Sequence, residues 1–276
     1  MELVVSRSRV SGRVEAPPSK SYTHRGILAG CLGDRTRVLN PLRSADTEAS
    51  IRCARGLGAS VEQDGDDLVI DGVDGLAVLT GDESLRSRPN GPLLSSLREL
   101  GATARSTRGN GCAPLVVGDS VVGGDTTIDG GVSSQFISSL LFAAPLTDGV
   151  TVAVEGTLKS RPYVDITLEV LEDTGIDVRE TDAGFDVPGG QRYTAEEFRV
   201  PGDFSSASYP LASGALAGEA TVGNLYPSAQ GDTVILDVLE SMGASVDWDP
   251  DTGVATVAGE ADELTGVTFD ASDNPD

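Results

Sequence analysis

Apolar and polar positions follow the same layout in three segments of the chain, starting near residues 17, 130 and 202. Each has a Gly or Pro, a Ser-rich stretch, a helix of small apolar residues, a Gly and a β-branched strand. Serine is a favoured N-cap, so each Ser-rich stretch predicts a helix start. The helices are apolar nearly all round, which predicts burial. The segments read PPSKSYTHRGILAGCLGDRTRVLN, GGVSSQFISSLLFAAPLTDGVTVAVEG and GDFSSASYPLASGALAGEATVGNL.

Each of these segments is the first half of a longer repeated unit, and a second half follows it in the sequence. The pattern predicts amphipathic helices over residues 45–59, 161–176 and 231–244, each with a glycine suited to the C-cap region. A hairpin follows each helix, with Asp and Gly at its turn. The repeated unit is therefore helix, strand, helix, strand, strand, recurring at about 70 residues.

A fourth second half, over residues 76–119, lacks its buried first helix. The preceding hairpin ends in DGVDG and runs straight into the strand, so about 30 residues are expected to be absent there. The last unit stops at GVTFDASDNPD, where another unit is expected to begin. We therefore expect an incomplete set of repeats.

The net charge of the chain disfavours some classes of binding partner. The 276 residues include 43 Asp and Glu against 20 Lys and Arg, a net charge of −23. The acidic residues are scattered, which is typical of a protein from a high-salt cytoplasm where surface charge is screened. The same charge argues against nucleic acid and anionic membranes as partners. No apolar stretch is long enough to span a bilayer and the N-terminus lacks a signal-peptide pattern, so we expect a cytoplasmic location.

Few residues here suit redox or metal chemistry. Cys31, Cys53 and Cys112 form no CxxC pair, and we expect reduced, mostly buried thiols. His24 is the only histidine, which excludes a His-based triad or a multi-His metal site. There is no P-loop and no G-x-G-x-x-G fingerprint.

Six short motifs occur in an order and spacing that are specific together, although each is weak alone. They are PPSKSYTHR (17–25), LTGDESLRSRPNGPL (79–93), VSSQF (132–136), LKSRPYVDIT (158–167), PGDFSSASYPLA (201–212) and QGD (230–232). On these motifs the chain resembles the EPSP synthase family of enolpyruvyltransferases over essentially its whole length.

The resemblance implies an α/β (α+β) fold: a two-domain inside-out α/β barrel of βαβαββ units, here incomplete. Residues 1–15 and 203–276 would form the first, incomplete domain. Residues 16–202 would form the second, missing about one helix and adjoining segments before Leu76. The family's helices aim their N-termini at a cleft, where their positive partial charge suits anions.

The implied reaction transfers the enolpyruvyl group of phosphoenolpyruvate to the 5-hydroxyl of shikimate 3-phosphate and releases phosphate, on the path to chorismate and aromatic amino acids. The resemblance implies no metal or organic cofactor, small-molecule substrates as the partners and a monomer. Three alternatives stay open. The first is the sister reaction, enolpyruvyl transfer to UDP-N-acetylglucosamine, which the sequences SSQ and SRPYVDIT disfavour. The second is a non-catalytic fragment that binds shikimate 3-phosphate or a complementary chain, and the third is an RNA-cyclase-like role, which the negative net charge disfavours.

The resemblance places cations on both substrates. Lys20 would contact both substrates at the centre of reaction, and Ser21 and Arg25 would bind the carboxylate and hydroxyl side of shikimate. Arg88 would hold phosphoenolpyruvate, because a planar guanidinium suits a carboxylate or phosphate. Arg86 competes for that role on the sequence alone.

The resemblance also implies that residues at the starts of two helices bind the 3-phosphate of shikimate 3-phosphate. Ser133, Ser134 and Ser160 would bind the 3-phosphate, and Tyr163 would contact the shikimate ring side. Gln135 would reach between the two substrates. The alternative for the serines is plain N-capping without a ligand, which is what we expect of the Ser205–Ser206 pair in the third segment.

The sequence departs from the family in two places. The motif N-[SA]-G-T-[TA]-M-R, which cradles phosphoenolpyruvate, should precede Leu76 and is absent. Asp276, the last residue given, resembles the aspartate that acts as general base in the family. The family segments that supply further catalytic or binding Lys, Glu and Arg residues would come after it and are not in this sequence. We therefore expect weak activity or none from this chain alone.

Overall fold

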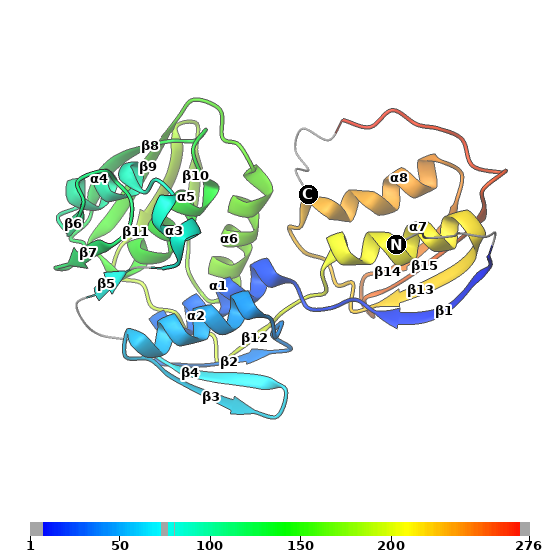
Figure 1. Cartoon of the computed structure of the whole chain (residues 1–276), viewed down its shortest axis with the longest axis horizontal. Coiled ribbons are helices and arrows are strands. Elements are labelled where there is room, and N and C mark those ends of the chain that lie inside the picture. The colour runs from blue at the N-terminus through cyan, green and yellow to red at the C-terminus, as the bar shows by residue number, and fades with distance from the viewer. Residues whose placement is uncertain (1–7, 73–76, 80, 271–276) are drawn as a thin grey trace. The chain divides into compact units, whose positions relative to one another are not determined.

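The computed structural model describes residues 8–72, 77–79 and 81–270. The chain divides into two compact units, Met1–Lys20 with Val200–Asp276, called unit 1, and Ser21–Arg199, called unit 2. In Figure 1, unit 1 carries the first blue and the last yellow-to-red segments, and unit 2 the colours between them. These limits lie within a few residues of the predicted ones, and equating the units with the family's two domains stays a prediction.

Unit 1 holds one four-stranded sheet with helices packed against it. Its strands, in spatial order, are β1 (Val10–Glu15), β13 (Gly218–Gly223), β15 (Val254–Glu260) and β14 (Ser245–Asp249). Its helices are α7 (Phe204–Ala217), the 3-10 turn η2 (Gly231–Val234) and α8 (Ile235–Ser241). Phe204, Leu211 and Val257 are fully buried in the core between them.

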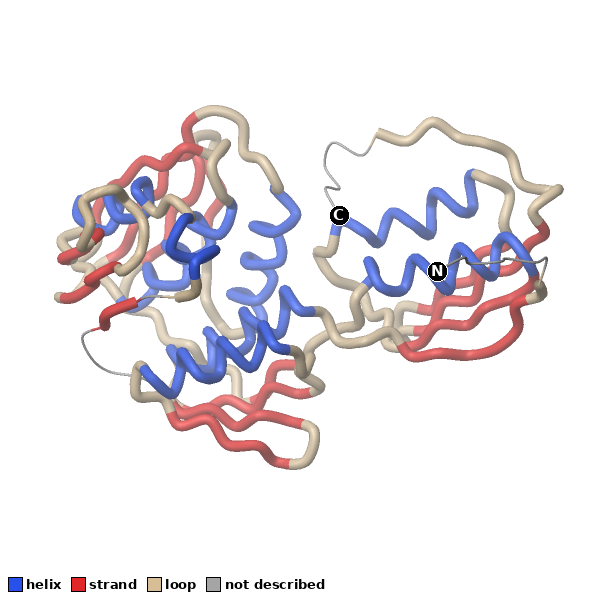
Figure 2. Tube along the Cα trace, viewed as in Figure 1, coloured by secondary structure: helices blue, strands red, loops and turns tan. Residues whose placement is uncertain are grey.

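Unit 2 holds three sheets (Figure 2). The first sheet contains β12 (Glu197–Arg199), β2 (Arg35–Leu39), β4 (Asp67–Asp71) and β3 (Ser60–Asp64). The second contains β8 (Gly124–Asp129), β9 (Gly149–Glu155), β11 (Gly184–Pro188) and β10 (Arg179–Thr181). The third contains β5 (Ala77–Leu79), β7 (Leu115–Gly118) and β6 (Thr103–Ser106). The helices are α1 (Lys20–Leu32), α2 (Ala45–Gly56), α3 (Glu83–Ser87), α4 (Gly91–Glu99), α5 (Ser134–Ala143), η1 (Ala144–Leu146) and α6 (Arg161–Asp173).

The three four-stranded sheets share one plan, which confirms the predicted repeat. In each, a parallel pair is followed by an antiparallel hairpin: β1 with β13, β8 with β9, and β12 with β2 are the parallel pairs. The third sheet of unit 2 has three strands and no parallel pair among the described residues. The mixture of helices and sheets confirms the predicted α/β class. The described strands form four separate open sheets, and no closed barrel of strands is found among them.

The three-stranded sheet packs with α4 around a small apolar cluster. Its buried residues are Leu94 on α4 with Ala104, Ala113 and Leu115. Leu79 on β5 is 41 % exposed.

Two strands pair away from their neighbours in sequence. Strand β1 precedes α1, yet it pairs with β13 of unit 1, and β12 precedes α7, yet it pairs with β2 of unit 2. The chain crosses between the units at two segments that bond to each other within unit 1: Ser19 N–H donates to Pro201 O, and Asp203 N–H donates to Pro17 O.

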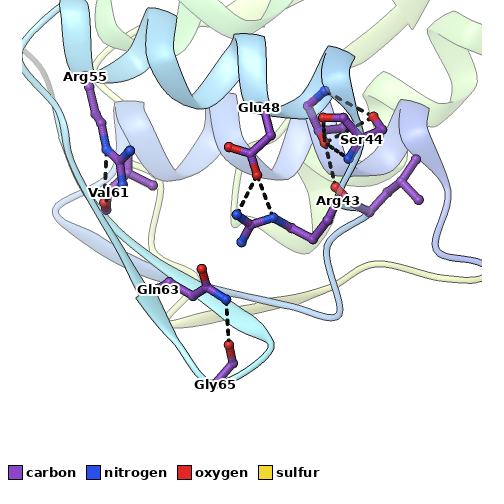
Figure 3. A network of polar contacts seen from close by, with 9 residues as sticks. Arg43, Ser44, Glu48, Arg55, Val61, Gln63 and Gly65 are labelled. Atoms are coloured by element: carbon purple, nitrogen blue, oxygen red, sulfur yellow. Dashed lines mark hydrogen bonds and ion pairs between the residues drawn. The ribbon is translucent and has the colours of Figure 1, made fainter.

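The amphipathic helices end as predicted. Gly58, Gly175 and Gly243, just beyond α2, α6 and α8, have φ values of 107°, 87° and 103°. This left-handed conformation suits glycine at a helix C-terminus. Helix α2 also begins with a capping box between Ser44 and Thr47. Figure 3 shows Ser44 close to the Arg43–Glu48 ion pair.

Two expectations about the first helices of the repeats are wrong for α7. Its N-cap is Asp203, without a side-chain capping bond, so the Ser205–Ser206 pair does not cap it. Ser206 Oγ instead donates to Asp203 Oδ2 at 2.9 Å. The helix is also not buried all round, because Tyr209 is 76 % exposed.

The cysteines are free, but the expectation that most are buried is wrong. Cys31 on α1 is buried, Cys53 on α2 is exposed and Cys112 is intermediate. Cys53 lies on the face of α2 that points to solvent, because α2 is an amphipathic helix buried on one side only. Within the described residues, no helix is long and apolar enough to cross a membrane.

Thiol reactivity tests this core. Burial raises the pKa of the Cys31 thiol to about 11, whereas Cys53 is open to solvent. At pH 8, we expect a thiol reagent to modify Cys53 rapidly and Cys31 only after unfolding, since the thiolate is the reactive form. The measurement is mass spectrometry of tryptic peptides after timed labelling, with denatured protein as the control. Equal labelling rates at the two positions in the folded protein would contradict this core.

Candidate anion site at three helix starts

Four α-helices of unit 2, namely α1, α4, α5 and α6, have no acidic residue in the first turn, and neither has α7 of unit 1. Helices α2, α3 and α8 each carry Asp or Glu there. Of the acid-free helices, α1, α5 and α6 carry the predicted site residues. Carboxylates are favoured at helix N-termini, because the unpaired N–H groups there are partly positive. In a chain with 43 acidic residues, acid-free first turns keep that positive end for another anion.

The starts of α5 and α6 lie next to each other. Gly130 N–H donates to Glu155 O at 2.9 Å, and Lys159 N–H donates to Gly130 O at 3.0 Å. A Cβ atom added at Gly130 would lie 2.8 Å from Val154 Cγ1 and 3.0 Å from Leu158 Cα. The absence of a side chain at Gly130 therefore allows the loops that lead into the two helices to touch.

The serines at these starts differ in what their hydroxyls do. Ser133 caps α5, since its Oγ accepts from Gln135 N–H at 3.3 Å. Ser134 is only 7 % exposed, and its hydroxyl makes no hydrogen bond with the described part of the chain. Ser160, the N-cap of α6, has φ 55° and makes no capping bond with its side chain. The hydroxyls of Ser134 and Ser160 are therefore available to a ligand, which plain N-capping does not explain.

Backbone strain points to the same position. A non-glycine residue in the left-handed region costs about 1–3 kcal/mol and persists where its surroundings hold it, often at ligand sites. Ser160 is in that region and keeps its hydroxyl away from its own helix.

Arg25 lies on α1 and bonds to α6. Its Nε–H donates to Thr167 Oγ1 at 2.9 Å, and its terminal N–H groups donate to Tyr163 O at 2.7 Å and to Ser21 O at 3.1 Å. All three acceptors are uncharged, and no carboxylate of a described residue pairs with Arg25. Desolvation lowers the pKa of its guanidinium to about 10, so the group keeps its charge at neutral pH.

A positive group with two N–H donors left over can bind an anion. Arg25 lacks an acidic partner, Ser134 and Ser160 offer hydroxyls, and α5 and α6 offer backbone N–H groups. Arg fits a carboxylate, and hydroxyls with helix N–H groups fit a phosphate. No group of three or more metal-ligating side chains is found among the described residues.

The other predicted site residues that the structure describes are exposed. Lys20 is the exposed first residue of α1 and is grouped with unit 1, and Gln135 is exposed in the first turn of α5. Arg88 is the exposed C-cap of α3, and no hydrogen bond or ion pair joins its side chain to another described residue. Arg86 is also exposed and donates to Asp82 O at 3.3 Å. Asp276 and Leu76 lie outside the described residues.

Sequence reasoning missed two polar residues beneath this site. Thr167 on α6 accepts from Arg25, and Ser138 on α5 lies 2.7 Å from it, Oγ to Oγ1. The signal was helical spacing: Thr167 follows Tyr163 by four residues and Ser138 follows Ser134 by four, so each shares a helix face with a predicted site residue.

Comparison with known proteins identifies the family. A sequence model described as EPSP synthase (3-phosphoshikimate 1-carboxyvinyltransferase) matches residues 4–75 and 68–276. The whole chain aligns at 49 % identity with 72 % of a 3-phosphoshikimate 1-carboxyvinyltransferase from Methanothrix thermoacetophila, and at 48 % with 73 % of one from Halobacterium salinarum. A solved EPSP synthase from Acinetobacter baumannii, 22 % identical, shares the fold with a TM-score of 0.79 over 92 % of this chain and 66 % of that one. The chain belongs to the EPSP synthase family of enolpyruvyltransferases.

The comparisons also bear on the missing residues. The alignment with the Methanothrix relative spans 306 positions for a chain of 276 residues, so that relative has at least 30 residues inside the aligned region that this chain lacks. The family match breaks near residues 68–75, where the sequence predicted the gap. The chain spans about 72 % of the curated relatives' length and 66 % of the solved one.

The close approach of the two loops can be tested with Gly130→Ala. The added methyl group meets backbone atoms of Leu158, so we expect a loss of about 1–3 kcal/mol in the free energy of unfolding, typical of overpacking. The control is Gly56→Ala on α2, where a Cβ meets nothing within 4 Å and we expect no loss. Denaturant unfolding measures both, and equal stability of the two variants would contradict the contact.

Proposed function

We propose that this chain binds shikimate 3-phosphate at the starts of α5 and α6, in the enolpyruvyl-transfer reaction that its relatives' names describe. The observation that carries the proposal is Arg25, a desolvated guanidinium with no acidic partner among described residues, on the helix that packs beside those starts. The proposed overall reaction moves the enolpyruvyl group from phosphoenolpyruvate to the 5-hydroxyl and releases phosphate.

The ligand's two charged groups match two parts of the site. The 3-phosphate would accept hydrogen bonds from the hydroxyls of Ser133, Ser134 and Ser160 and from the N–H groups at the start of α5. The carboxylate would pair with Arg25, and Tyr163 and Ser21 would contact the ring side. Charge-assisted bonds of this kind are shorter and stronger than neutral ones.

The remaining roles follow from the chemistry of transfer. The 5-hydroxyl must lose a proton as it adds to the enol, and the methylene carbon must gain one before phosphate leaves. Lys20 would stabilise negative charge as it develops there. Arg88 and Gln135 would hold phosphoenolpyruvate, and Asp276 would take the hydroxyl proton.

One observation favours a second function, binding without turnover. The relative from Methanothrix has at least 30 residues within the aligned region that this chain lacks, and the family match breaks near residues 68–75. In the family this region carries the phosphoenolpyruvate motif named above. A chain without it would keep the shikimate 3-phosphate site and lose much of its second substrate site.

Binding is tested first, by calorimetry with shikimate 3-phosphate in molar potassium chloride. We expect Ser134→Ala to weaken binding about 10-fold, the effect of one hydrogen bond to a charged group. The matched control is Ser139→Ala on the same helix, because Ser139 Oγ already donates to Phe136 O and should leave affinity within about 2-fold. Equal effects of the two substitutions would contradict the proposed phosphate site.

Turnover is tested with both substrates present, by measuring release of inorganic phosphate beside a complete relative. Release that depends on shikimate 3-phosphate supports transfer by this chain. Binding without release supports the second function. Absence of binding contradicts both.

A further inference from the structure

Thr167 lies at the point where the three helices of the site meet. It is fully buried on α6, and its hydroxyl contacts α1 and α5. Oγ1 lies 2.9 Å from Arg25 Nε, 2.7 Å from Ser138 Oγ and 3.0 Å from Tyr163 O. The Thr167 hydroxyl therefore connects the helices that carry Arg25, Ser134 and Ser160.

The donors and acceptors in this cluster fit one assignment of protons. A threonine hydroxyl donates once and accepts twice. Arg25 Nε can only donate, so Thr167 accepts from it, and Tyr163 O can only accept, so Thr167 donates to it. One acceptor site then remains on Thr167, which takes the proton of Ser138. The Thr167 hydroxyl is thereby saturated.

The assignment fixes the direction of the Arg25 side chain. Thr167 holds Nε, while Tyr163 O and Ser21 O hold the two terminal nitrogens, so all three nitrogens are bound to the protein on one side. The guanidinium has five N–H donors, and two stay available to a ligand. Without the Thr167 oxygen, a buried charged donor would lose its acceptor and the side chain would turn toward water.

We propose that Thr167, supported by Ser138, is a positioning residue that aims the guanidinium of Arg25 at the carboxylate of the bound anion. The identity of that anion as shikimate 3-phosphate rests on the proposed function. The aim of the guanidinium does not, because every contact that sets it lies within the protein.

The variants separate positioning from packing. Thr167→Val keeps the shape and removes the hydroxyl, and Thr167→Ser keeps the hydroxyl and removes a methyl group. Ser138→Ala removes only the support of Thr167. The matched control is Thr174→Val at the C-cap of α6, because Thr174 is 1 % exposed and its hydroxyl bonds only to α6 carbonyls at Val170 and Leu171.

The first measurement is the affinity for shikimate 3-phosphate by calorimetry. We expect Thr167→Val to lower it about 10-fold and Ser138→Ala about 3-fold, with Thr167→Ser and Thr174→Val within about 2-fold of the unchanged chain. A merely structural role would make Thr174→Val as harmful as Thr167→Val, and that result would overturn the proposal.

The second measurement needs no ligand. The Nε–H signal of Arg25 in a ¹⁵N NMR spectrum, assigned by its loss in Arg25→Lys, should exchange slowly with water in the unchanged chain. We expect fast exchange in Thr167→Val and slow exchange in Thr167→Ser and Thr174→Val. An unaltered signal in Thr167→Val would overturn the proposal.

The two measurements separate the two claims. If the unchanged chain binds no shikimate 3-phosphate, the proposed function fails, and the Nε–H signal then decides by itself whether Thr167 positions Arg25. If Thr167→Val does not fold, Ser138→Ala takes its place. The expected result is then faster exchange of the Arg25 signal than in the unchanged chain, and unchanged exchange would overturn the proposal.

Discussion

A partly buried positive charge with no ion-pair partner among the described residues is the constraint on which unit 2 depends. The guanidinium of Arg25 is partly desolvated and donates to uncharged acceptors on α1 and α6. Burial of an unpaired charge is costly, so such a group survives in a fold only where other interactions hold it. Here three hydrogen bonds to neutral oxygens hold it, and the acid-free starts of α1, α5 and α6 add to the same positive region.

Much of this arrangement could be predicted because it is local. Helix periodicity and glycine positions gave α2, α6 and α8 with their C-terminal glycines, and the repeat gave the common plan of three sheets. Ser133 was predicted as a helix start and is one. The start of α7 was predicted wrongly, because Ser and Asp both favour the N-cap and composition alone does not choose between Ser205 and Asp203.

The contacts between helices could not be predicted in the same way. Thr167 and Arg25 are 142 positions apart in the sequence, and Ser138 and Thr167 are 29 apart. A threonine in an amphipathic helix reads as an ordinary core or surface residue until its neighbours in space are known. Likewise, the gap before Leu76 was visible as a break in the repeat, but the loss of a parallel strand pair from the third sheet emerged only from the pairing itself.

The pairing of β1 with a strand far along the sequence, β13, has a consequence for folding during synthesis. Strand β1 leaves the ribosome first, but its partner β13 is more than 200 residues later, with Val10 opposite Gly218. All of the helices and strands of unit 2 lie between β1 and β13 in the sequence. Unit 2 can therefore form while β1 is still unpaired, and the sheet of unit 1 must wait until β13, β14 and β15 have been synthesised. During that interval the exposed strand is the segment of the nascent chain most open to pairing with a wrong partner.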